Sequence, residues 1–230
     1  MASSSIGFKE LPYASLPVSL EQPDLQLEVR ESTGDFPHKL ILISGICSNR
    51  DVMRGEETQL FGLAARYDIE NGICILPGTH SKHVWIRDKA IVDFKTFLTG
   101  ELFDLLSTKS ILRNSVLPDM PFHGEAFTKG LYQAQRENML ATLFRIRADE
   151  ILRHTDPGEN YYFLSGLLIG TELATLSEYP SARILLAGED PLRQLYSKAL
   201  HFLEIDHLYV TSTENLVVEG HRSIINNMQT

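Results

Sequence analysis

Residues 73–97 read ICILPGTHSKHVWIRDKAIVDFKTF, and here the spacing of apolar residues changes from that of a helix to that of strands. It contains three runs rich in apolar residues and two short turns: the runs are 73–76, 84–86 and 91–97, and the turns are 77–80 and 88–89. Apolar runs joined by such short connections are typical of neighbouring antiparallel strands. The sequence therefore predicts an antiparallel meander in the middle of the chain.

Before the meander, the sequence predicts a segment without regular secondary structure, followed by a strand and a helix. Residues 1–37 are punctuated by prolines and are expected to be extended and loop-like. The mostly apolar run 40–46 predicts a strand that is buried on both faces. Apolar residues spaced along 56–66 predict one face of a helix.

After Gly100 the pattern is helical almost throughout, to about residue 180. One β-α unit and a final strand and helix follow: a strand at 183–187 ended by Gly188, a helix opened by Pro191, a strand at 207–210 and a helix at 214–228. This order of elements fits half of a two-lobed α/β fold.

Composition narrows the class of protein. The 230 residues include 30 acidic and 21 basic side chains, for a net charge of −9, which argues against nucleic acid or an anionic membrane as partner. No segment approaches the roughly 18 continuous apolar residues of a membrane helix, and the N-terminus does not resemble a signal peptide. Two cysteines without a CxxC motif fit a reducing compartment. We expect a soluble, cytoplasmic protein.

The turn Pro77-Gly78-Thr79-His80 has two interpretations. Glycine lets the backbone approach a phosphate closely, and the threonine adds a hydroxyl beside the backbone amides. His80 and Lys82 add donors next to the turn. Taken alone, however, a Pro-Gly turn between strands is a simple hairpin turn.

The helix start Arg54-Gly55-Glu56-Glu57 could serve a phosphoryl transfer. A carboxylate such as Glu56 or Glu57 can orient or deprotonate an acceptor hydroxyl. Acidic residues in a first helical turn also complement the helix dipole without any catalytic role. Arg54 could clamp a substrate carboxylate, or it could pair with Glu57.

Two later glycine positions are candidates for nucleotide contact. Gly188 ends a buried strand, where open α/β sheets bind ligands, although a tight β-α turn needs glycine too. Gly166 and Gly170 are four residues apart in an apolar helix, which favours close helix packing or a gap for a flat ligand such as adenine. His80 and His83 flank a turn without an obvious third ligand, so no metal site is predicted.

The order of these motifs resembles the actin/hexokinase-like (ribonuclease H-like) ATPases, and the sequence is similar to the 2-dehydro-3-deoxygalactonokinase family. Six segments carry the resemblance in family order: GFKELPY (7–13), MRGEETQL (53–60), PGTHSK (77–82), FLTGEL (97–102), FLSGLLIG (163–170) and AG (187–188). Together they span nearly the whole chain. The resemblance implies a two-lobed α/β kinase fold.

It also implies a sugar-acid kinase that uses ATP and Mg²⁺ to phosphorylate 2-dehydro-3-deoxy-D-galactonate at its 6-hydroxyl in galactonate breakdown. By position, Glu56 resembles the acceptor-orienting base, with Glu57 as the alternative. The ATP phosphates would face the turn and the residues beside it, which are Gly78, Thr79, His80 and Lys82. The adenosine would contact Gly188 and Gly166. Arg54 is assigned to the substrate carboxylate from its charge alone.

Family members begin with an Asp-Trp-Gly-Thr-like phosphate motif that this sequence lacks. The first lobe is therefore expected to be incomplete. Residues 1–67 would be its remnant with a connecting helix, and residues 68–230 the nucleotide-side lobe, whose last helix returns to the hinge. We expect little kinase activity from this chain alone. Two kinds of macromolecular partner follow from this expectation. One is a separate chain that supplies the first lobe, and the other is a second copy of this chain in a homo-oligomer.

Two other functions stay open from the sequence. One is a non-catalytic ligand-binding or interaction protein derived from such a kinase. The other is a kinase of the same architecture that acts on another 2-keto-3-deoxy sugar acid.

Overall fold

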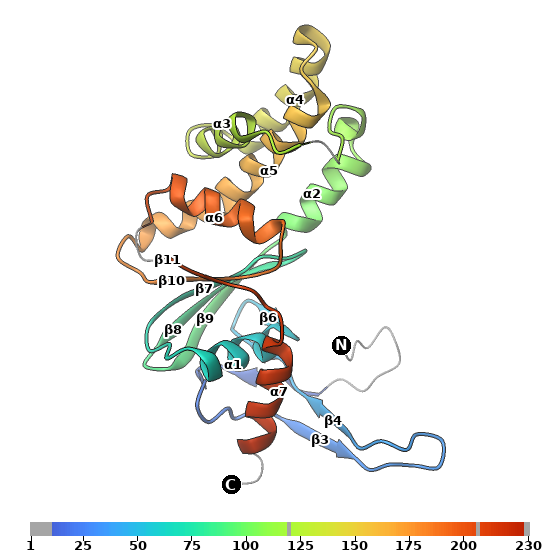
Figure 1. Cartoon of the computed structure of the whole chain (residues 1–230), viewed down its shortest axis with the longest axis vertical. Coiled ribbons are helices and arrows are strands. Elements are labelled where there is room, and N and C mark those ends of the chain that lie inside the picture. The colour runs from blue at the N-terminus through green and yellow to red at the C-terminus, as the bar shows by residue number, and fades with distance from the viewer. Residues whose placement is uncertain (1–10, 119–120, 206–207, 228–230) are drawn as a thin grey trace. The chain divides into compact units, whose positions relative to one another are not determined.

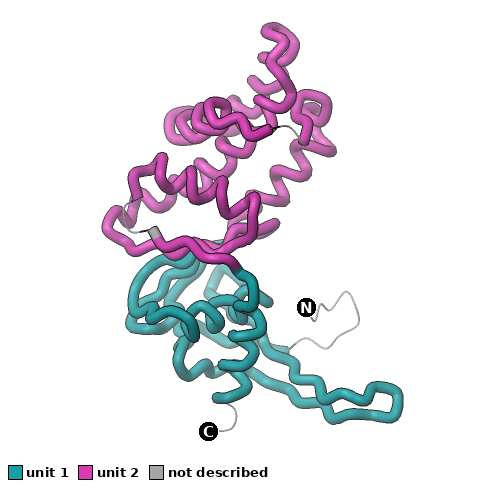
Figure 2. Tube along the Cα trace, in the orientation of Figure 1, with its two compact units in different colours: residues 1–74, 83–96, 213–230 teal, residues 75–82, 97–212 magenta. Residues whose placement is uncertain are grey.

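The structure is a computed structural model that describes residues 11–118, 121–205 and 208–227 (Figure 1). The chain divides into two compact units (Figure 2): unit 1 comprises 1–74, 83–96 and 213–230, and unit 2 comprises 75–82 and 97–212. Both units are discontinuous in sequence, whereas the predicted lobes, divided after residue 67, are continuous. The division into these two lobes stays a prediction.

Unit 1 contains most of the strands and two helices. They are β1 (Ala14–Ser15), β2 (Val18–Ser19), β3 (Leu27–Arg30), β4 (Leu40–Ile43), β5 (Ile46–Cys47), β6 (Val52–Met53), most of β7 (Gly72–Leu76), β8 (Ser81–Arg87) and β9 (Ala90–Phe97), and the helices α1 (Glu56–Arg66) and α7 (Leu216–Asn227). Helix α1 packs against α7. Its apolar face is buried through Leu60 and Leu63, as the spacing of apolar residues predicts.

The predicted meander is confirmed as β7, β8 and β9. They are consecutive in the sheet order β11-β10-β7-β8-β9-β2, and β2 runs antiparallel to β9. Asp88 and Lys89 connect β8 to β9 with φ angles of 49° and 56°. Two consecutive positive φ values are the geometry that matches the twist of a tight hairpin.

The prediction of one strand over 40–46, buried on both faces, is wrong. The segment forms two strands, β4 and β5, which lie in different sheets. Strand β4 pairs with β3 in a two-stranded ribbon, and within β4 only Leu42 is buried. Each strand of a two-stranded ribbon is paired along one edge only and little of it is covered, so its apolar residues stay partly exposed. The expected loop before residue 37 also contains short strands, β1 to β3.

Unit 2 contains the helical region expected after Gly100. Its elements are α2 (Thr99–Thr108), η2 (Ile111–Asn114), α3 (Gly124–Ala134), α4 (Met139–Arg153), α5 (Pro157–Leu173), η3 (Ala174–Glu178), β10 (Ile184–Ala187), α6 (Leu192–Phe202) and β11 (Leu208–Thr211). Helix α5 contacts α2, α3, α4 and α6. The Asp156 side chain accepts hydrogen bonds at the start of α5, and Pro157 occupies its first position.

The predicted β-α unit is confirmed with small shifts. Strand β10 is buried along its whole length and pairs in parallel with β11. Helix α6 begins at Leu192, one residue after Pro191. Residues 207 and 228, at the edges of the last predicted strand and helix, lie outside the described residues. No described helix is long and apolar enough to cross a membrane.

Candidate functional site

The predicted phosphate turn lies in unit 2 against the first turn of α2. The backbone amide of Glu101 donates to the carbonyl of Thr79 at 3.0 Å. A Cβ added to Gly100 would lie 2.5 Å from the carbonyl oxygen of Gly78 and 2.8 Å from Cα of Thr79. The absence of a side chain at Gly100 therefore permits this close approach. The positive end of a helix dipole consequently lies beside the turn.

The outer side of the turn is open. Apart from its chain neighbours, none of the described residues has an atom within 4 Å of the position that a Cβ on Gly78 would take, and Thr79 is exposed. A ligand could thus approach the backbone at Gly78 as closely as glycine allows. A helix N-terminus and an open glycine backbone together form the kind of surface that binds anions.

His80 and Lys82 play different parts beside the turn. His80 is exposed, and its Nε2 lies 2.5 Å from Oε2 of Glu101. Lys82 is only 3% exposed, and its ammonium group donates to the carbonyl of His80 at 3.3 Å. Lys82 thus contacts the backbone of the turn from the protein interior.

Gly188 is buried beside the same turn. A Cβ at Gly188 would lie 3.4 Å from Cδ of Pro77, and the amide of Gly188 donates to the carbonyl of Thr211 at 3.2 Å. Unit 2 therefore brings the predicted phosphate and adenosine positions together. The face of Gly188 toward Pro77 is filled by protein, so a nucleotide would have to contact another side of this residue.

Gly166 occupies a helix crossing. Its Cβ position lies 2.1 Å from the carbonyl oxygen of Phe127 in α3, and the Cβ position of Gly130 lies 2.3 Å from the carbonyl oxygen of Phe163 in α5. The two glycines thus let α3 and α5 pack backbone against backbone. This geometry favours the packing interpretation of Gly166, because the gap that adenine would need is occupied by α3.

Sequence reasoning missed a buried carboxylate in unit 2. Glu172 of α5 is 2% exposed and accepts hydrogen bonds from Ser81 Oγ at 2.7 Å, from Tyr196 OH at 2.6 Å and from Thr99 Oγ1. Burial, and next the charge of Glu172, raise the pKa of Tyr196 well above its usual value, so its hydroxyl remains a donor. The one available signal was a charged residue within the apolar run of α5.

In unit 1, two carboxylates close the start of α1. Oε2 of Glu57 accepts the amide of Gly55 at 2.6 Å, and Oε2 of Glu56 accepts the amide of Arg54 at 3.1 Å. Gly55 has φ 111°, a conformation that favours glycine. These bonds give both carboxylates a structural role at the helix N-terminus.

Glu57 also has an unusual protonation equilibrium. Glu57 is 3% exposed, and burial raises the pKa of its carboxyl group from 4.5 to about 7. Two backbone hydrogen bonds act in the opposite direction and lower this pKa. The neighbouring charge of Glu56 adds to the rise. A carboxyl group with a pKa near 7 can accept a proton at neutral pH and release it again. Glu56, in contrast, is half-buried.

Arg54 contacts Tyr13 in unit 1. Its guanidinium group donates to the Tyr13 hydroxyl, and its Cζ atom lies 4.8 Å from the centre of the ring. The aromatic contact fixes the direction of the guanidinium. The predicted site residues thus form two groups, Arg54, Glu56 and Glu57 in unit 1, and the glycine turn with its neighbours in unit 2.

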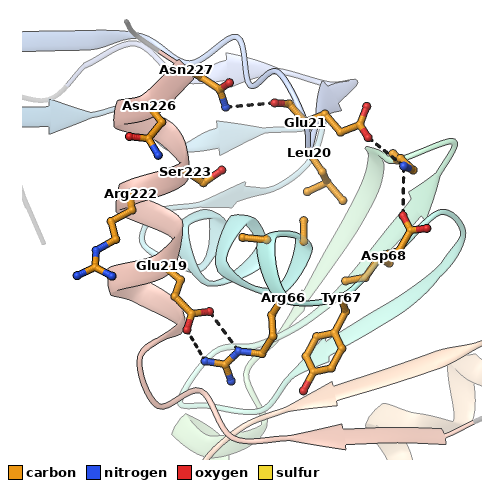
Figure 3. A pocket seen from close by; sticks show the side chains of 14 residues that line it. Leu20, Glu21, Arg66, Tyr67, Asp68, Glu219, Arg222, Ser223, Asn226 and Asn227 are labelled. Atoms are coloured by element: carbon orange, nitrogen blue, oxygen red, sulfur yellow. Dashed lines mark hydrogen bonds and ion pairs between the residues drawn. The ribbon is translucent and has the colours of Figure 1, made fainter.

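A polar groove of about 770 Å³ in unit 1 contains none of the predicted site residues (Figure 3). Arg66 donates to both carboxylate oxygens of Glu219, at 3.1 and 2.7 Å. Lys89 lies 2.9 Å from Glu21 and 3.2 Å from Asp68. These two cations thus pair with three carboxylates, and we assign the groove no part in a reaction.

Comparison with known proteins places the chain in a family. The model of the family described as "DGOK: 2-keto-3-deoxy-galactonokinase" matches residues 1–224. The 2-dehydro-3-deoxygalactonokinase of Escherichia coli (strain K12) is 36% identical over 213 residues, which cover 90% of this chain and 70% of the relative. A Rhizobium meliloti (strain 1021) protein assigned the same activity is 36% identical over 214 residues, covering 87% and 68%.

A solved structure gives the same result for the fold. The crystal structure of a protein from Sinorhizobium meliloti, assigned as a 2-dehydro-3-deoxygalactonokinase, superposes with a TM-score of 0.82 at 31% identity. The alignment covers 94% of this chain and 74% of that one. The predicted family and the α/β class are therefore confirmed. The chain belongs to the 2-keto-3-deoxy-galactonokinase family.

Proposed function

We propose that this protein is a sugar-acid kinase that transfers the γ-phosphoryl group of ATP to the 6-hydroxyl of 2-dehydro-3-deoxy-D-galactonate. The observation that carries the proposal is the family match along residues 1–224, with relatives that bear the name of this activity. The two small molecules are its partners in this reaction.

The nucleotide side of the reaction is assigned to unit 2. The open backbone at Gly78, the exposed Thr79 and the start of α2 offer donors and a positive dipole to the ATP phosphates. Lys82 supports the turn from the interior through the His80 carbonyl. Gly188, beside Pro77, is assigned to the adenosine end. Gly166 is left out because α3 fills the space next to it.

The acceptor side is assigned to the start of α1. A base beside the acceptor hydroxyl takes up its proton as the oxygen attacks phosphorus, and the leaving ADP carries away the bonding electron pair. Glu57, whose pKa is about 7, suits this role at neutral pH, and Glu56 is the neighbouring alternative. Arg54, held by Tyr13, is assigned to the carboxylate of the sugar acid.

Mg²⁺ is proposed as the ion that arrives with ATP. The described residues contain no group of three or more His, Cys, Asp or Glu side chains placed to hold a metal. Mg²⁺ commonly keeps several waters and binds through substrate phosphates. We therefore assign no protein residue to the ion and no step to it.

Titration calorimetry of the whole chain with ATP in excess Mg²⁺ tests the nucleotide assignment. We expect Gly78→Ala to weaken ATP binding about tenfold, because a methyl group would stand where phosphates approach the backbone. Since no protein atom lies near that methyl position, the unfolding free energy should change by less than about 1 kcal/mol.

The matched control is Gly34→Ala, a glycine in unit 1 with equally open surroundings. It should leave ATP binding unchanged. A wild-type chain that binds neither ATP nor the sugar acid would contradict the proposed function, and equal ATP affinity in wild type and Gly78→Ala would contradict the role of the turn.

A further inference from the structure

One buried carboxylate in unit 2 receives hydroxyl groups from three separate elements. Ser81 is the first residue of β8, Thr99 is the first residue of α2, and Tyr196 lies in α6. Ser81 donates to Oε1 of Glu172, whereas Thr99 and Tyr196 donate to Oε2. Both carboxylate oxygens are therefore used, and the two donors farthest apart in the chain, Ser81 and Tyr196, are separated by 115 residues.

Each of these three elements is next in sequence to a segment that lies at or beside the proposed phosphate turn. Ser81 follows His80 directly, and Thr99 precedes Gly100, the residue that touches Gly78 and Thr79. Helix α6, which contains Tyr196, follows the Gly188 turn that packs on Pro77. The carboxylate of Glu172 thus accepts hydrogen bonds from the residue after the turn, from the residue before Gly100, and from the helix that follows the Gly188 segment.

The hydrogen bonds to Glu172 contribute more to the relative position of the three elements than to the overall stability of the fold. A carboxylate in the interior costs free energy unless hydrogen bonds satisfy it, and buried charged groups often contribute little net stability compared with apolar packing. Three hydroxyl donors satisfy this one, and hydrogen bonds to a charged group are short and directional. They hold the three elements in one relative position, which a purely apolar contact would specify less tightly.

We propose that Glu172 is a positioning residue for nucleotide binding, which holds β8, α2 and α6 so that the turn at Gly78 keeps the shape that accepts phosphates. The inference rests on the proposed function, because it takes ATP as the ligand of this turn. Glu172 is not expected to touch the nucleotide itself.

The primary test is Glu172→Gln in the whole chain. An amide has one acceptor oxygen and one NH₂ group, so it cannot accept from both Ser81 and the Thr99–Tyr196 pair. We expect the dissociation constant for Mg·ATP, measured by titration calorimetry, to rise about tenfold. The dissociation constant for 2-dehydro-3-deoxy-D-galactonate should stay within about twofold. A merely structural role would lower the fraction of folded protein and leave both constants unchanged.

Single-donor variants refine the test. Thr99→Val and Tyr196→Phe each remove one hydroxyl with little change in shape, and each should weaken ATP binding less than Glu172→Gln does. The matched control is Ser165→Ala, another buried serine, whose hydroxyl donates to the carbonyl of Tyr161 within α5 at 3.0 Å. This variant should bind ATP like the wild type.

The outcomes separate the two proposals. If the wild type binds no Mg·ATP, the proposed function fails and this inference fails with it. If the wild type binds Mg·ATP and folded Glu172→Gln binds it equally well, only the inference is overturned. If Glu172→Gln does not fold, wild-type affinity in both Thr99→Val and Tyr196→Phe overturns the inference, and weakened affinity in them supports it.

Discussion

The surroundings of Glu57 disfavour the charged form of its carboxyl group. Burial raises its pKa from 4.5 to about 7, so the folded chain holds this proton more tightly than the unfolded chain does. The stability that this provides is complete below pH 4.5 and is lost as pH rises through 7. The full difference corresponds to about 3 kcal/mol.

We therefore expect Glu57→Gln to gain stability relative to the wild type as pH rises. Gln cannot ionise, so the difference in unfolding free energy between variant and wild type should grow by up to about 3 kcal/mol between pH 4.5 and pH 8. Urea unfolding of both proteins at the two pH values measures this change. Any constant effect of the amide itself cancels in the comparison.

Glu56→Gln is the matched control for this measurement. Glu56 is the preceding residue and accepts a backbone amide in a similar way, but it is half-buried. Its variant should differ from the wild type by a similar small amount at both pH values. A Glu57→Gln difference that does not change with pH would show that the Glu57 carboxyl is not buried as described.

At the scale of elements, the crossing of α3 and α5 depends on two glycines. We expect Gly166→Ala to lower the unfolding free energy by about 2 kcal/mol or more, because its methyl group would overlap the carbonyl oxygen of Phe127 and push the helices apart. Chemical denaturation followed by circular dichroism measures the loss.

The control for the crossing is Gly124→Ala at the start of α3. There the nearest atom to the added Cβ belongs to the Phe122 ring, at 3.4 Å, and a side chain can move. Little loss is expected, because the added methyl group makes an ordinary contact. If both variants were equally stable, the close approach of α3 and α5 would be wrong and Gly166 would again be available to a ligand.

At the scale of the whole molecule, the two proposed substrates belong to different units. We expect Mg·ATP to slow amide hydrogen exchange in unit 2, at 77–80 and 99–101, because ligand binding lowers the population of locally open states. The sugar acid should slow exchange at 54–58 in unit 1. Mass spectrometry of the whole chain with each ligand separately resolves these peptides.

Protection by both ligands in the same segment would contradict this division of the substrates. AMP, which cannot donate a γ-phosphoryl group, serves at the same concentration as the control for adenosine contact. It should protect the region near Gly188 more than the Gly78 turn, since it lacks the β- and γ-phosphates.

Local signals in the sequence predicted much of the fold. The meander, the helix at 56–66 and the β-α unit ending at Gly188 follow from residue periodicity and turn residues, which act over a few positions. The prediction for 40–46 is wrong because an apolar run has no periodicity that distinguishes a fully buried strand from a partly exposed one. Its pairing with β3 decided the matter.

Most of the elements, the family and the residue types of the candidate site could be predicted from the sequence. Tertiary structure alone decided the burial of Glu57 and Lys82, the contact of Gly100 with the turn and the convergence of Ser81, Thr99 and Tyr196 on Glu172. The physical reason is that pKa values, close approaches and buried hydrogen bonds depend on residues that are distant along the chain, whereas helices, strands and turns depend mainly on near neighbours.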